Sequence, residues 1–334
     1  MPPRQASAPR AFYEAEAQVF ARYGLRVRTR QLRLREPDVS LRAVETGSAT
    51  GEPLVLLHGI CLASAHWAPL VARLGPRRCV LVDMPGHGGS DGADYAGVDL
   101  RRWHVRLLAG CLDALGLDAA HVVGHSYGGM VGLWLALDAP QRVRSVVALG
   151  TPSVALGARP DLTLRILATR GIGPLVLAMP SPQFAYRRVL ARSLGRRAVG
   201  SAPRELVRAT YLGTRRRDLP RTVSTYLREQ FRGAAASPPR YALGDEELAR
   251  IRRPVLLVWG DRDDRYQPIG EARRKASRIP AARFEVVRGG HEPWLDDPEP
   301  CARLVAEFVD DHAGGTETNS VRAGGPEAAS SETR

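Results

Sequence analysis

Lysine is nearly missing from this chain: all but one of its 48 basic residues are arginine, the exception being Lys275. Cysteine is scarce too, and the four thiols form no C-x-x-C pair, so the usual signature of a zinc or redox site is lacking. No disulfide framework is indicated, as is typical of a reducing cytoplasm. Residues 1–10 lack the apolar stretch of a secretory signal, and the longest apolar runs have the length of strands. We therefore expect a cytoplasmic protein with neither a metal nor a cofactor.

The excess of positive charge is confined to one segment. The composition is ordinary for a globular protein, with 44% hydrophobic and 25% charged residues, but the net charge is +13. Residues 152–245 contain 17 arginines and five acidic residues, which leaves 31 of 48 basic and 30 of 35 acidic residues for the rest of the chain. The remainder is thus almost neutral.

Short apolar runs alternate with helical patterns along most of the chain. Continuous runs of this kind fit strands that are buried on both faces of a parallel sheet. The pattern predicts an α/β fold with a mostly parallel, doubly wound sheet. The expected strands are 54–57, 80–82, 121–123, 146–149, 255–259 and 284–287, preceded by an antiparallel pair at 25–34 and 41–44. The expected helices are 11–23, 66–74, 98–115, 127–138, 269–279 and 300–312.

The alternation is interrupted once. Residues 152–245 show helical patterns and prolines but no convincing strand, so we interpret them as a helical cap, or lid, inserted into the sheet domain. The core would then comprise residues 25–151 and 246–313, with an N-terminal helix or arm at 1–24. Residues 314–334 are rich in Gly, Ser, Thr, Glu and Ala, and we expect them to be a disordered tail.

The most informative motif is Gly124-His125-Ser126-Tyr127-Gly128, a G-x-S-x-G sequence between an apolar run and a helical pattern. In a strand–turn–helix context this motif places the serine on a sharp, strained turn with its side chain exposed. Glycines are needed two residues before and after the serine, because a Cβ there would collide with the neighbouring strand or helix. Ser126 is therefore the candidate nucleophile, and it needs a base to take its proton.

Further motifs follow the other expected strands in a fixed order. They are His58-Gly59, the D-x-P-G-H-G-x-S run from Asp83 to Ser90, the W-G-x-x-D run from Trp259, and Gly290-His291-Glu292-Pro293. Together with G-H-S-x-G-G they resemble the α/β-hydrolase superfamily over roughly residues 40–155 and 245–312. The resemblance implies that His291 is the general base. His87 and His125 fit that role less well, since His87 resembles a structural histidine of the family and His125 points away from the serine.

The acid that orients His291 is ambiguous by one residue. The family pattern resembles G-x-x-D-x-x-x-P, and counting forward from Gly260 selects Asp263, whereas counting back from Pro268 selects Asp264. We favour Asp263, because the glycine turn that leaves the strand fixes that end of the loop more tightly. Asp261 is a third candidate.

The resemblance also implies an oxyanion hole made by the backbone N–H groups of Ile60 and Tyr127. Trp67 and Trp294 are candidates to line the acyl pocket, and simple packing in the core is the equal alternative for each.

These features favour a cofactor-independent serine hydrolase that cleaves a carboxylic ester through an acyl-enzyme. One alternative is C–C bond hydrolysis of a ring-cleavage-type diketone, which some similar capped hydrolases perform. Another is a non-catalytic binding protein on the same fold. Because superfolds host many chemistries, the sequence leaves the substrate and the oligomeric state open.

The arginine-rich cap also has three interpretations. It is a solvated surface, a region that attracts an anionic small-molecule acyl substrate, or a dock for an anionic membrane or acidic partner; the sequence favours the first two. Nucleic acid is not expected as a partner, because no recognised binding motif accompanies the charge.

Overall fold

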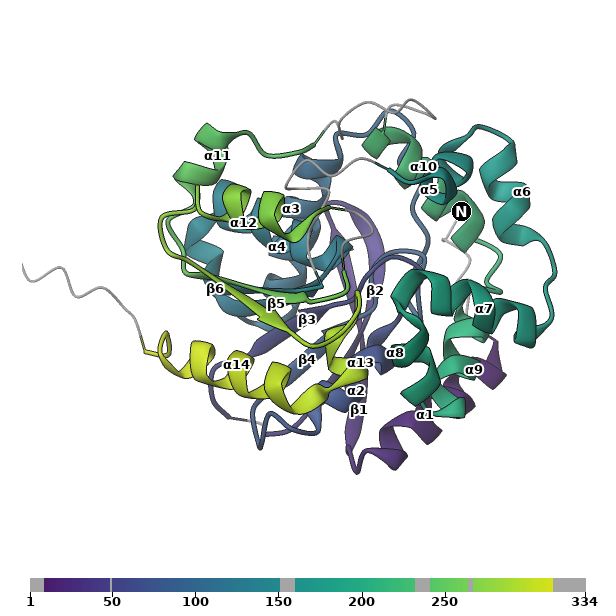
Figure 1. Cartoon of the computed structure of the whole chain (residues 1–334), viewed down its shortest axis with the longest axis horizontal. Helices are drawn as coiled ribbons and strands as arrows, with labels where there is room; N and C mark the ends of the chain where they lie inside the picture. The colour runs from purple at the N-terminus through teal and green to yellow at the C-terminus, as the bar shows by residue number, and fades with distance from the viewer. Residues whose placement is uncertain (1–8, 49, 151–159, 232–240, 264–266, 315–334) are drawn as a thin grey trace, which may run out of the picture.

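The computed structural model describes residues 9–48, 50–150, 160–231, 241–263 and 267–314 (Figure 1). The tail predicted at 314–334 lies outside the described residues, apart from Gly314. Asp264 also lies outside them.

One mixed sheet forms the centre of the molecule, with the strand order β1-β2-β4-β3-β5-β6-β7-β8. β1 and β2 pair antiparallel, and β2 is antiparallel to β4, whereas all other neighbours are parallel. The predicted mostly parallel α/β sheet is therefore confirmed. The strands are β1 (Val27–Arg35), β2 (Asp38–Thr46), β3 (Leu54–Leu57), β4 (Cys79–Val82), β5 (Ala120–His125), β6 (Val143–Leu149), β7 (Val255–Gly260) and β8 (Ala282–Val287).

The central strands are apolar throughout because both faces of the sheet are covered. Side chains alternate between the faces with a period of two. In β3, Val55 and Leu57 join one apolar cluster, while Leu54 and Leu56 join the other. All four residues are fully buried.

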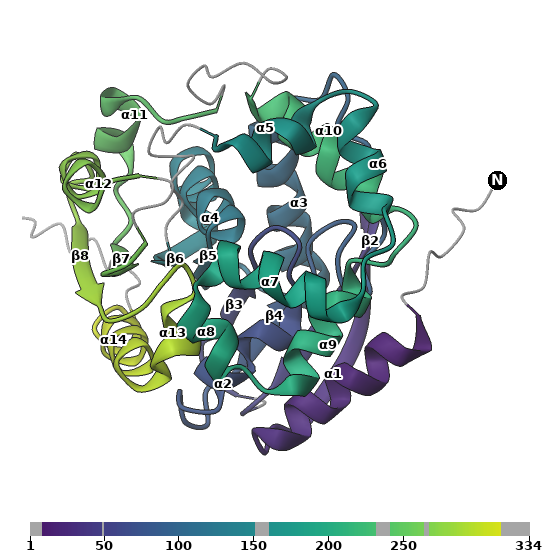
Figure 2. The same cartoon turned by 45° about the vertical axis from the view of Figure 1, so that its right-hand side comes forward.

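Helices cover both faces (Figures 1 and 2). α3 and α4 contribute to the first cluster, whereas α2 and α14 contribute to the second. The helices outside residues 152–245 are α1 (Arg10–Arg22), α2 (Ala68–Val71), α3 (Leu100–Leu115), α4 (Tyr127–Asp138), α11 (Asp245–Arg250), α12 (Ile269–Ala276), α13 (Pro293–Asp296) and α14 (Pro298–Asp310). The helix predicted at 66–74 is shorter than expected: a 3₁₀ turn at Ser64–Trp67 leads into α2.

Between β6 and α11, the described residues fold only into helices. We call α5–α10 the inserted helices. They are α5 (Leu162–Ala168), α6 (Ile172–Ala178), α7 (Gln183–Leu194), α8 (Arg196–Ser201), α9 (Arg204–Gly213) and α10 (Leu219–Phe231). In Figure 1, α5, α6 and α7 lie on the right-hand side of the molecule and α14 at its lower left, whereas in Figure 2 α7 crosses the front. Nowhere in the described part of the chain is a helix long and apolar enough to cross a membrane.

Candidate active site

Ser126 occupies the turn between β5 and α4. Its φ of 49° and ψ of −106° form a conformation that costs a non-glycine residue about 1–3 kcal/mol. A Cβ on Gly128 would lie 2.1 Å from the carbonyl oxygen of Leu57, and one on Gly124 would lie 2.3 Å from the amide nitrogen of Gly129. The predicted need for both glycines is confirmed. Ser126 is partly exposed, although the residues on either side of it are buried.

The imidazole of His291 lies beside the carboxylate of Asp263. The distance from Nδ1 of His291 to Oδ2 of Asp263 is 2.8 Å, and the two residues are only 7% and 3% exposed. The carboxylate oxygen accepts this hydrogen bond, so Nδ1 carries the proton. Nε2, on the other edge of the ring, is then the basic nitrogen.

The position of Asp263 agrees with the count from Gly260. The backbone N–H of Asp263 donates to the Gly260 carbonyl over 3.0 Å, and its own carbonyl accepts a 2.7 Å bond from the indole N–H of Trp259. The backbone that carries the carboxylate is thus tied to the end of β7 on both sides. Asp264, the alternative acid, cannot be compared with it, because it lies outside the described residues.

Two other carboxylates hold the loop that leads to His291. Oδ1 of Asp261 accepts a 2.9 Å bond from the N–H of Gly289. Oδ2 of Asp296 accepts a 2.9 Å bond from the N–H of Gly290. Asp261, the third candidate acid, therefore binds the backbone of the loop.

The two expected oxyanion donors lie on segments that meet at His125. Gly59 packs so closely that a Cβ there would be 2.5 Å from Nδ1 of His125, which brings the following residue, Ile60, to the end of β5. Tyr127 is the first residue of α4, and the first N–H groups of a helix have no acceptor within the helix. The backbone N–H of Tyr127 therefore directly follows Ser126, and Ile60 is one residue beyond the contact between Gly59 and His125; their role as an oxyanion hole stays a prediction.

Two neutral histidines hold the loop that contains Ile60. Nδ1–H of His58 donates to the carbonyl of Gly59 over 2.7 Å, and its Nε2 accepts from the N–H of Met84 over 2.9 Å. His87 accepts a 2.9 Å bond from the N–H of Cys61 through Nε2 and donates through Nδ1 to Pro85. Burial lowers the pKa of His58 to about 4 and that of His87 to about 3. Both rings are therefore uncharged linkers between loops.

The ring of Tyr127 is enclosed by α3 and α10. Its hydroxyl donates to Nε2 of His104, whose Nδ1–H donates to the carbonyl of Leu100 over 2.7 Å. The ring of Tyr226, on α10, lies 4.7 Å from that of Tyr127 between centroids. Burial lowers the pKa of His104 to about 4, so this ring is neutral as well. The turn after Ser126 is thus braced by side chains that the sequence analysis did not single out.

Trp67 and Trp294 are packed in the core. Both are fully buried, and their rings stack on each other at 4.6 Å with a 16° interplanar angle. Trp294 also donates from Nε1 to the carbonyl of His66 over 2.8 Å. The packing alternative describes both residues in this structure, and the expectation that they line an acyl pocket is corrected accordingly.

A buried polar pair behind the His291 loop was also missed. Both carboxylate oxygens of Glu292 lie 3.1 Å from Nδ1 of His66, and neither residue is more than 2% exposed. The hydroxyl of Thr210, on α9, donates to the Leu206 carbonyl, so its oxygen must accept from Nε2–H of His66, 2.7 Å away. A second proton must then lie between His66 and Glu292, on one or the other. The pair is neutral overall and connects an inserted helix to the core.

His125 joins this pair to the backbone of His291. Its Nε2–H donates to the carbonyl of His291 over 3.1 Å, and its Nδ1 lies 3.7 Å from Glu292. Burial, followed by the nearby charge of His291, lowers the pKa of His125 far below its usual value. This neutral ring supports the loop, in keeping with the expectation that His125 is not the base.

Arg42 forms a buried ion-pair network at the turn that begins at Asp83. Nη1 of Arg42 is 2.9 Å from Oδ2 of Asp83, and Nη2 of the same guanidinium binds Glu16 of α1. Ser64 donates to the other Asp83 oxygen over 2.7 Å. These contacts anchor α1 and the 58–64 loop to the sheet. The described residues contain no cluster of three His, Cys, Asp or Glu side chains placed to hold a metal ion.

Comparison with known proteins places this geometry in a family. A family model described as the alpha/beta hydrolase fold matches residues 52–298. That range includes Ser126, Asp263 and His291.

Curated relatives match over most of the chain. A 2-hydroxy-6-oxononadienedioate/2-hydroxy-6-oxononatrienedioate hydrolase from Burkholderia vietnamiensis is 31% identical over 82% of this chain and 93% of its own length. A 2-hydroxy-6-oxo-2,4-heptadienoate hydrolase from Pseudomonas putida is 30% identical over 78% of this chain and 89% of its own.

Solved structures share the fold. The meta-cleavage product hydrolase CumD of Pseudomonas fluorescens IP01 is 25% identical, with a TM-score of 0.67 over 84% of this chain and 97% of its own. A carboxylesterase from Bacillus subtilis is 23% identical, with a TM-score of 0.68 over 89% of this chain and 96% of its own. With the family match, the 31% identical relative and the shared fold, the chain belongs to the α/β-hydrolase fold family.

Proposed function

We propose that this hydrolase uses Ser126, His291 and Asp263 to cleave a carbon–carbon bond beside a ketone in an anionic, conjugated substrate. The observation that carries the proposal is the 2.8 Å bond between His291 and Asp263, next to a serine on a strained, glycine-flanked turn. This arrangement supports an activated nucleophile with an oriented base. A non-catalytic binding protein has no physical need for it.

The substrate class follows the relatives. The sequence motifs alone favour ester hydrolysis, but the relatives at 30% and 31% identity are named for 2-hydroxy-6-oxo-dienoates, which favours C–C hydrolysis. The likeness to a carboxylesterase, at 23% identity, concerns the fold alone. Ester cleavage therefore becomes the competing chemistry that an experiment must separate.

The first half of the reaction forms an acyl-enzyme. The hydroxyl of Ser126 adds to the ketone carbon while Nε2 of His291 takes its proton, and Asp263 stabilises the resulting imidazolium. The backbone N–H groups of Ile60 and Tyr127 stabilise the oxyanion. For a 2-hydroxy-6-oxo-dienoate, this step requires the 2-oxo tautomer, in which the hydroxyl proton has moved to the carbon beside the ketone. The bond between that carbon and the attacked carbon then breaks, and its electron pair delocalises into the conjugated 2-oxo fragment. That carbon takes the proton from His291, so the fragment leaves with a new C–H bond and its carboxylate unchanged.

The second half releases the acid. Water loses a proton to His291 and adds to the acyl carbon, and the serine oxygen leaves with that proton. One water is consumed, and the serine, histidine and aspartate return to their starting states. An ester differs only in its leaving group, an alkoxide instead of a carbanion, so the same three residues support both reactions.

The charge of the chain fits an anionic substrate. The segment 152–245 carries 17 arginines against five acidic residues, and such an excess raises the local concentration of carboxylates. We further propose that the enzyme works in the cytoplasm, where the unpaired thiols of Cys61, Cys79, Cys111 and Cys301 would remain reduced. Recovery of the native protein in a periplasmic or culture-supernatant fraction would contradict this compartment.

The test compares two substrate classes on one enzyme preparation. A 2-hydroxy-6-oxo-6-phenyl-dienoate is followed by the loss of its conjugated absorbance, and a series of p-nitrophenyl esters by release of the phenol. We expect kcat/KM for the dienoate to exceed that for the best ester by roughly a hundredfold or more. Ser126→Ala should retain less than about a thousandth of either activity, with an unchanged unfolding curve.

The outcomes distinguish the alternatives. Faster ester turnover would overturn the C–C assignment but keep the serine hydrolase. Turnover that survives Ser126→Ala would overturn the mechanism. No turnover of either class by a folded protein would support the binding-protein alternative.

A further inference from the structure

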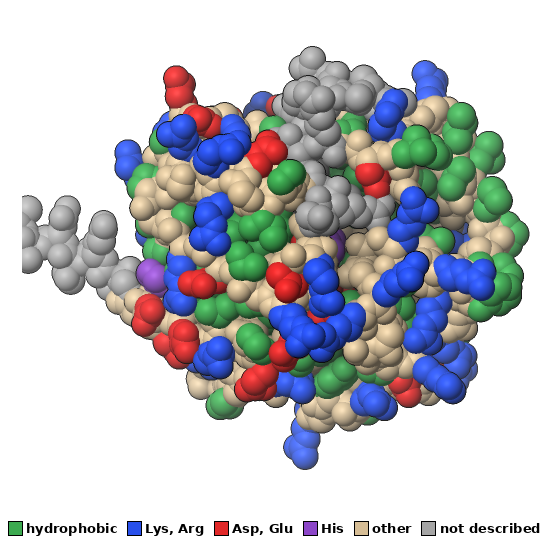
Figure 3. Space-filling model, viewed as in Figure 1, with side chains coloured by type: hydrophobic (Ala, Val, Ile, Leu, Met, Phe, Trp, Pro, Cys, Tyr) green, Lys and Arg blue, Asp and Glu red, His purple; other side chains and the backbone are tan. Residues whose placement is uncertain are grey.

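The exposed apolar side chains of this protein are concentrated on three inserted helices. Of the ten large hydrophobic residues exposed among those described, eight lie on α5, α6, α7 or the residue that ends α6. They are Leu162, Ile166, Ile172, Leu175, Val176, Met179, Phe184 and Val189. Leu175 and Phe184 are each 69% exposed. Figure 3 shows hydrophobic side chains gathered at the right edge, where Figure 1 places α6, with Lys and Arg side chains nearby. Exposed apolar residues in such a cluster mark an interaction site.

The same stretch carries charge of one sign only. Residues 162–204, from α5 to the start of α9, contain eight arginines and no aspartate or glutamate. α6 itself has no charged residue, whereas α7 and α8 carry five arginines. They are Arg187, Arg188, Arg192, Arg196 and Arg197, and Nε of Arg197 lies 3.9 Å from a carboxylate oxygen of Asp296. Apolar side chains beside a local excess of arginine over acidic residues are typical of a protein surface that lies in the interface of an anionic membrane.

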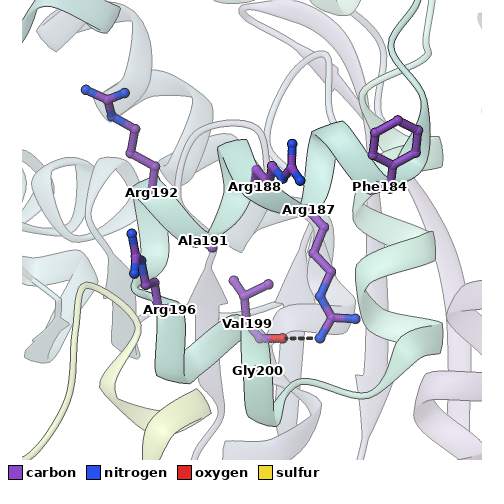
Figure 4. Close-up of a pocket in the computed structure, with 8 residues that line it drawn as sticks. All are labelled: Phe184, Arg187, Arg188, Ala191, Arg192, Arg196, Val199 and Gly200. Carbon is purple, nitrogen blue, oxygen red and sulfur yellow. Dashed lines mark hydrogen bonds between the residues drawn. The ribbon is translucent and has the colours of Figure 1, made fainter.

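A cavity of about 780 Å³ lies between α7 and α8 (Figure 4). Four arginines are among its lining residues, together with apolar residues. The lining residues are Phe184, Arg187, Arg188, Ala191, Arg192, Arg196, Val199 and Gly200. One of the guanidiniums is held in place, since Nη2 of Arg187 donates to the carbonyl of Val199 over 3.1 Å. A guanidinium group can bind a phosphate through two parallel N–H···O hydrogen bonds, and the apolar lining suits an attached hydrocarbon chain.

The charge distinguishes a lipid surface from a second copy of this chain. In a symmetric dimer the same patch meets itself, so the arginines of α7 and α8 would face one another without an acidic residue from 162–204 between them. An anionic bilayer instead supplies negative charge for the arginines and an apolar interior for the exposed hydrophobic side chains. We propose that α5–α8 form a docking surface for a membrane rich in anionic phospholipid, with the apolar side chains inserted and the α7–α8 cavity holding a lipid phosphate.

Docking would place the membrane next to the loop of the catalytic histidine. The turn between α7 and α8 packs on that loop: a Cβ on Gly290 would lie 2.6 Å from the carbonyl oxygen of Leu194, and Cα of Gly290 is 3.8 Å from the Cβ position of Gly195. The docking itself does not depend on which bond the enzyme cleaves.

Vesicle sedimentation with the full-length protein tests the proposal. Wild type is mixed with vesicles of phosphatidylcholine alone or with an equal share of phosphatidylglycerol, at low and high salt. We expect binding only to the anionic vesicles, and its loss at high salt as the charges are screened. Equal binding to both vesicle types, or to neither, would overturn the proposal.

Matched variants separate the surface from the overall charge. Arg188→Gln/Arg192→Gln/Arg196→Gln should weaken vesicle binding by about fivefold for each arginine, or about a hundredfold together. Arg28→Gln/Arg33→Gln/Arg35→Gln removes the same charge from exposed positions of β1 and should retain most of the binding.

The apolar part is tested in the same way. Leu175→Ser/Phe184→Ser should weaken binding, whereas Val27→Ser/Val286→Ser, at exposed sites on β1 and β8, should not. All variants are compared by thermal unfolding. Equal losses in variants and controls would overturn the proposal, as would a wild-type dimer in analytical ultracentrifugation that Leu175→Ser/Phe184→Ser dissociates.

Discussion

In the sheet core, arginines such as Arg42 and Arg101 are paired with carboxylates of the same molecule, whereas in the inserted segment cations far outnumber anions. Arg42 of the core binds both Asp83 and Glu16, and Arg101 binds Asp138 and Glu247. The segment 152–245, by contrast, holds 17 of the 48 basic residues but only five of the 35 acidic ones.

The two regions differ in their apolar residues as well. Strands β3, β4, β5 and β7 have no exposed position, while α5–α7 carry most of the exposed large hydrophobics of the described chain. The core residues are thus determined by packing within the molecule. The inserted segment also makes ion pairs, such as Arg216 with Asp218 and Arg221 with Asp94, but it carries more cations than anions and exposes more large apolar side chains than the core does.

Among the changes considered, Asp263→Asn should cause the largest loss, and that loss is in kcat. The amide can accept a bond from His291 only weakly and cannot stabilise the imidazolium, so kcat should fall by about 10⁴-fold with little change in fold. Asp261→Asn is the matched control, because an amide oxygen can still accept the bond from Gly289. Steady-state kinetics on both variants checks this. Similar losses in the two would contradict the assignment of Asp263.

Glycine substitutions should separate the tightly packed core from the open helices. Gly128→Ala puts a Cβ 2.1 Å from a backbone oxygen of β3, and we expect it to lower the free energy of unfolding by about 3 kcal/mol. Gly200 lies in α8 with nothing within 4 Å of the added Cβ, so Gly200→Ala should raise stability by about 0.5–1 kcal/mol. Urea unfolding measures both. Equal effects would mean that the two regions do not differ in packing.

Thr210→Val tests the connection between the two regions. The change keeps the shape but removes the acceptor for Nε2–H of His66, which leaves a buried donor unsatisfied. We expect a loss of about 2 kcal/mol in the free energy of unfolding. Thr163→Val, at an exposed site on α5, should change it by less than about 0.5 kcal/mol. If both variants unfold like wild type, the hydrogen bond between His66 and Thr210 contributes nothing measurable to the free energy of unfolding.

Lowering the pH should reduce the free energy of unfolding, because three buried histidines of the core are neutral in the folded state. Burial lowers the pKa values of His58, His87 and His104 to about 4, 3 and 4, below the value of about 6.5 expected in the unfolded chain. The unfolded state therefore takes up protons first, so their contribution is complete above pH 6.5 and is lost as the pH falls towards 4. Each histidine adds up to about 1.4 kcal/mol per pH unit.

Urea unfolding between pH 7 and pH 4.5 measures this slope. His87→Gln should reduce the slope of stability against pH by the contribution of one histidine, up to about 1.4 kcal/mol per pH unit. A stability that stays flat from pH 6.5 to pH 5 would contradict the neutral-histidine interpretation.

Much of the fold was predictable because local rules agreed with the tertiary structure. The continuous apolar runs gave the parallel strands, and G-x-S-x-G gave the turn at Ser126. The helix predicted at 66–74 was too long, because the chain enters it through a 3₁₀ turn at Ser64–Trp67.

Contacts between distant residues could not be read from the sequence. Glu292 meets His66 across 226 positions, and His66 meets Thr210 across 144. No local pattern encodes such pairings. The stacking of Trp67 on Trp294 could not be predicted for the same reason. An aromatic residue near a site has the same local sequence pattern whether it packs in the core or lines a pocket. The exposure of α5–α7 also required the structure.

The central claim is that Ser126 is an activated nucleophile, and covalent labelling tests it most directly. Purified protein is treated with a fluorophosphonate, and the adduct is located by peptide mass spectrometry in wild type and in His291→Ala. We expect one adduct per chain, on Ser126, whose formation slows by at least about a thousandfold without His291. A folded wild-type protein that is not labelled, or is labelled at another residue, would contradict it.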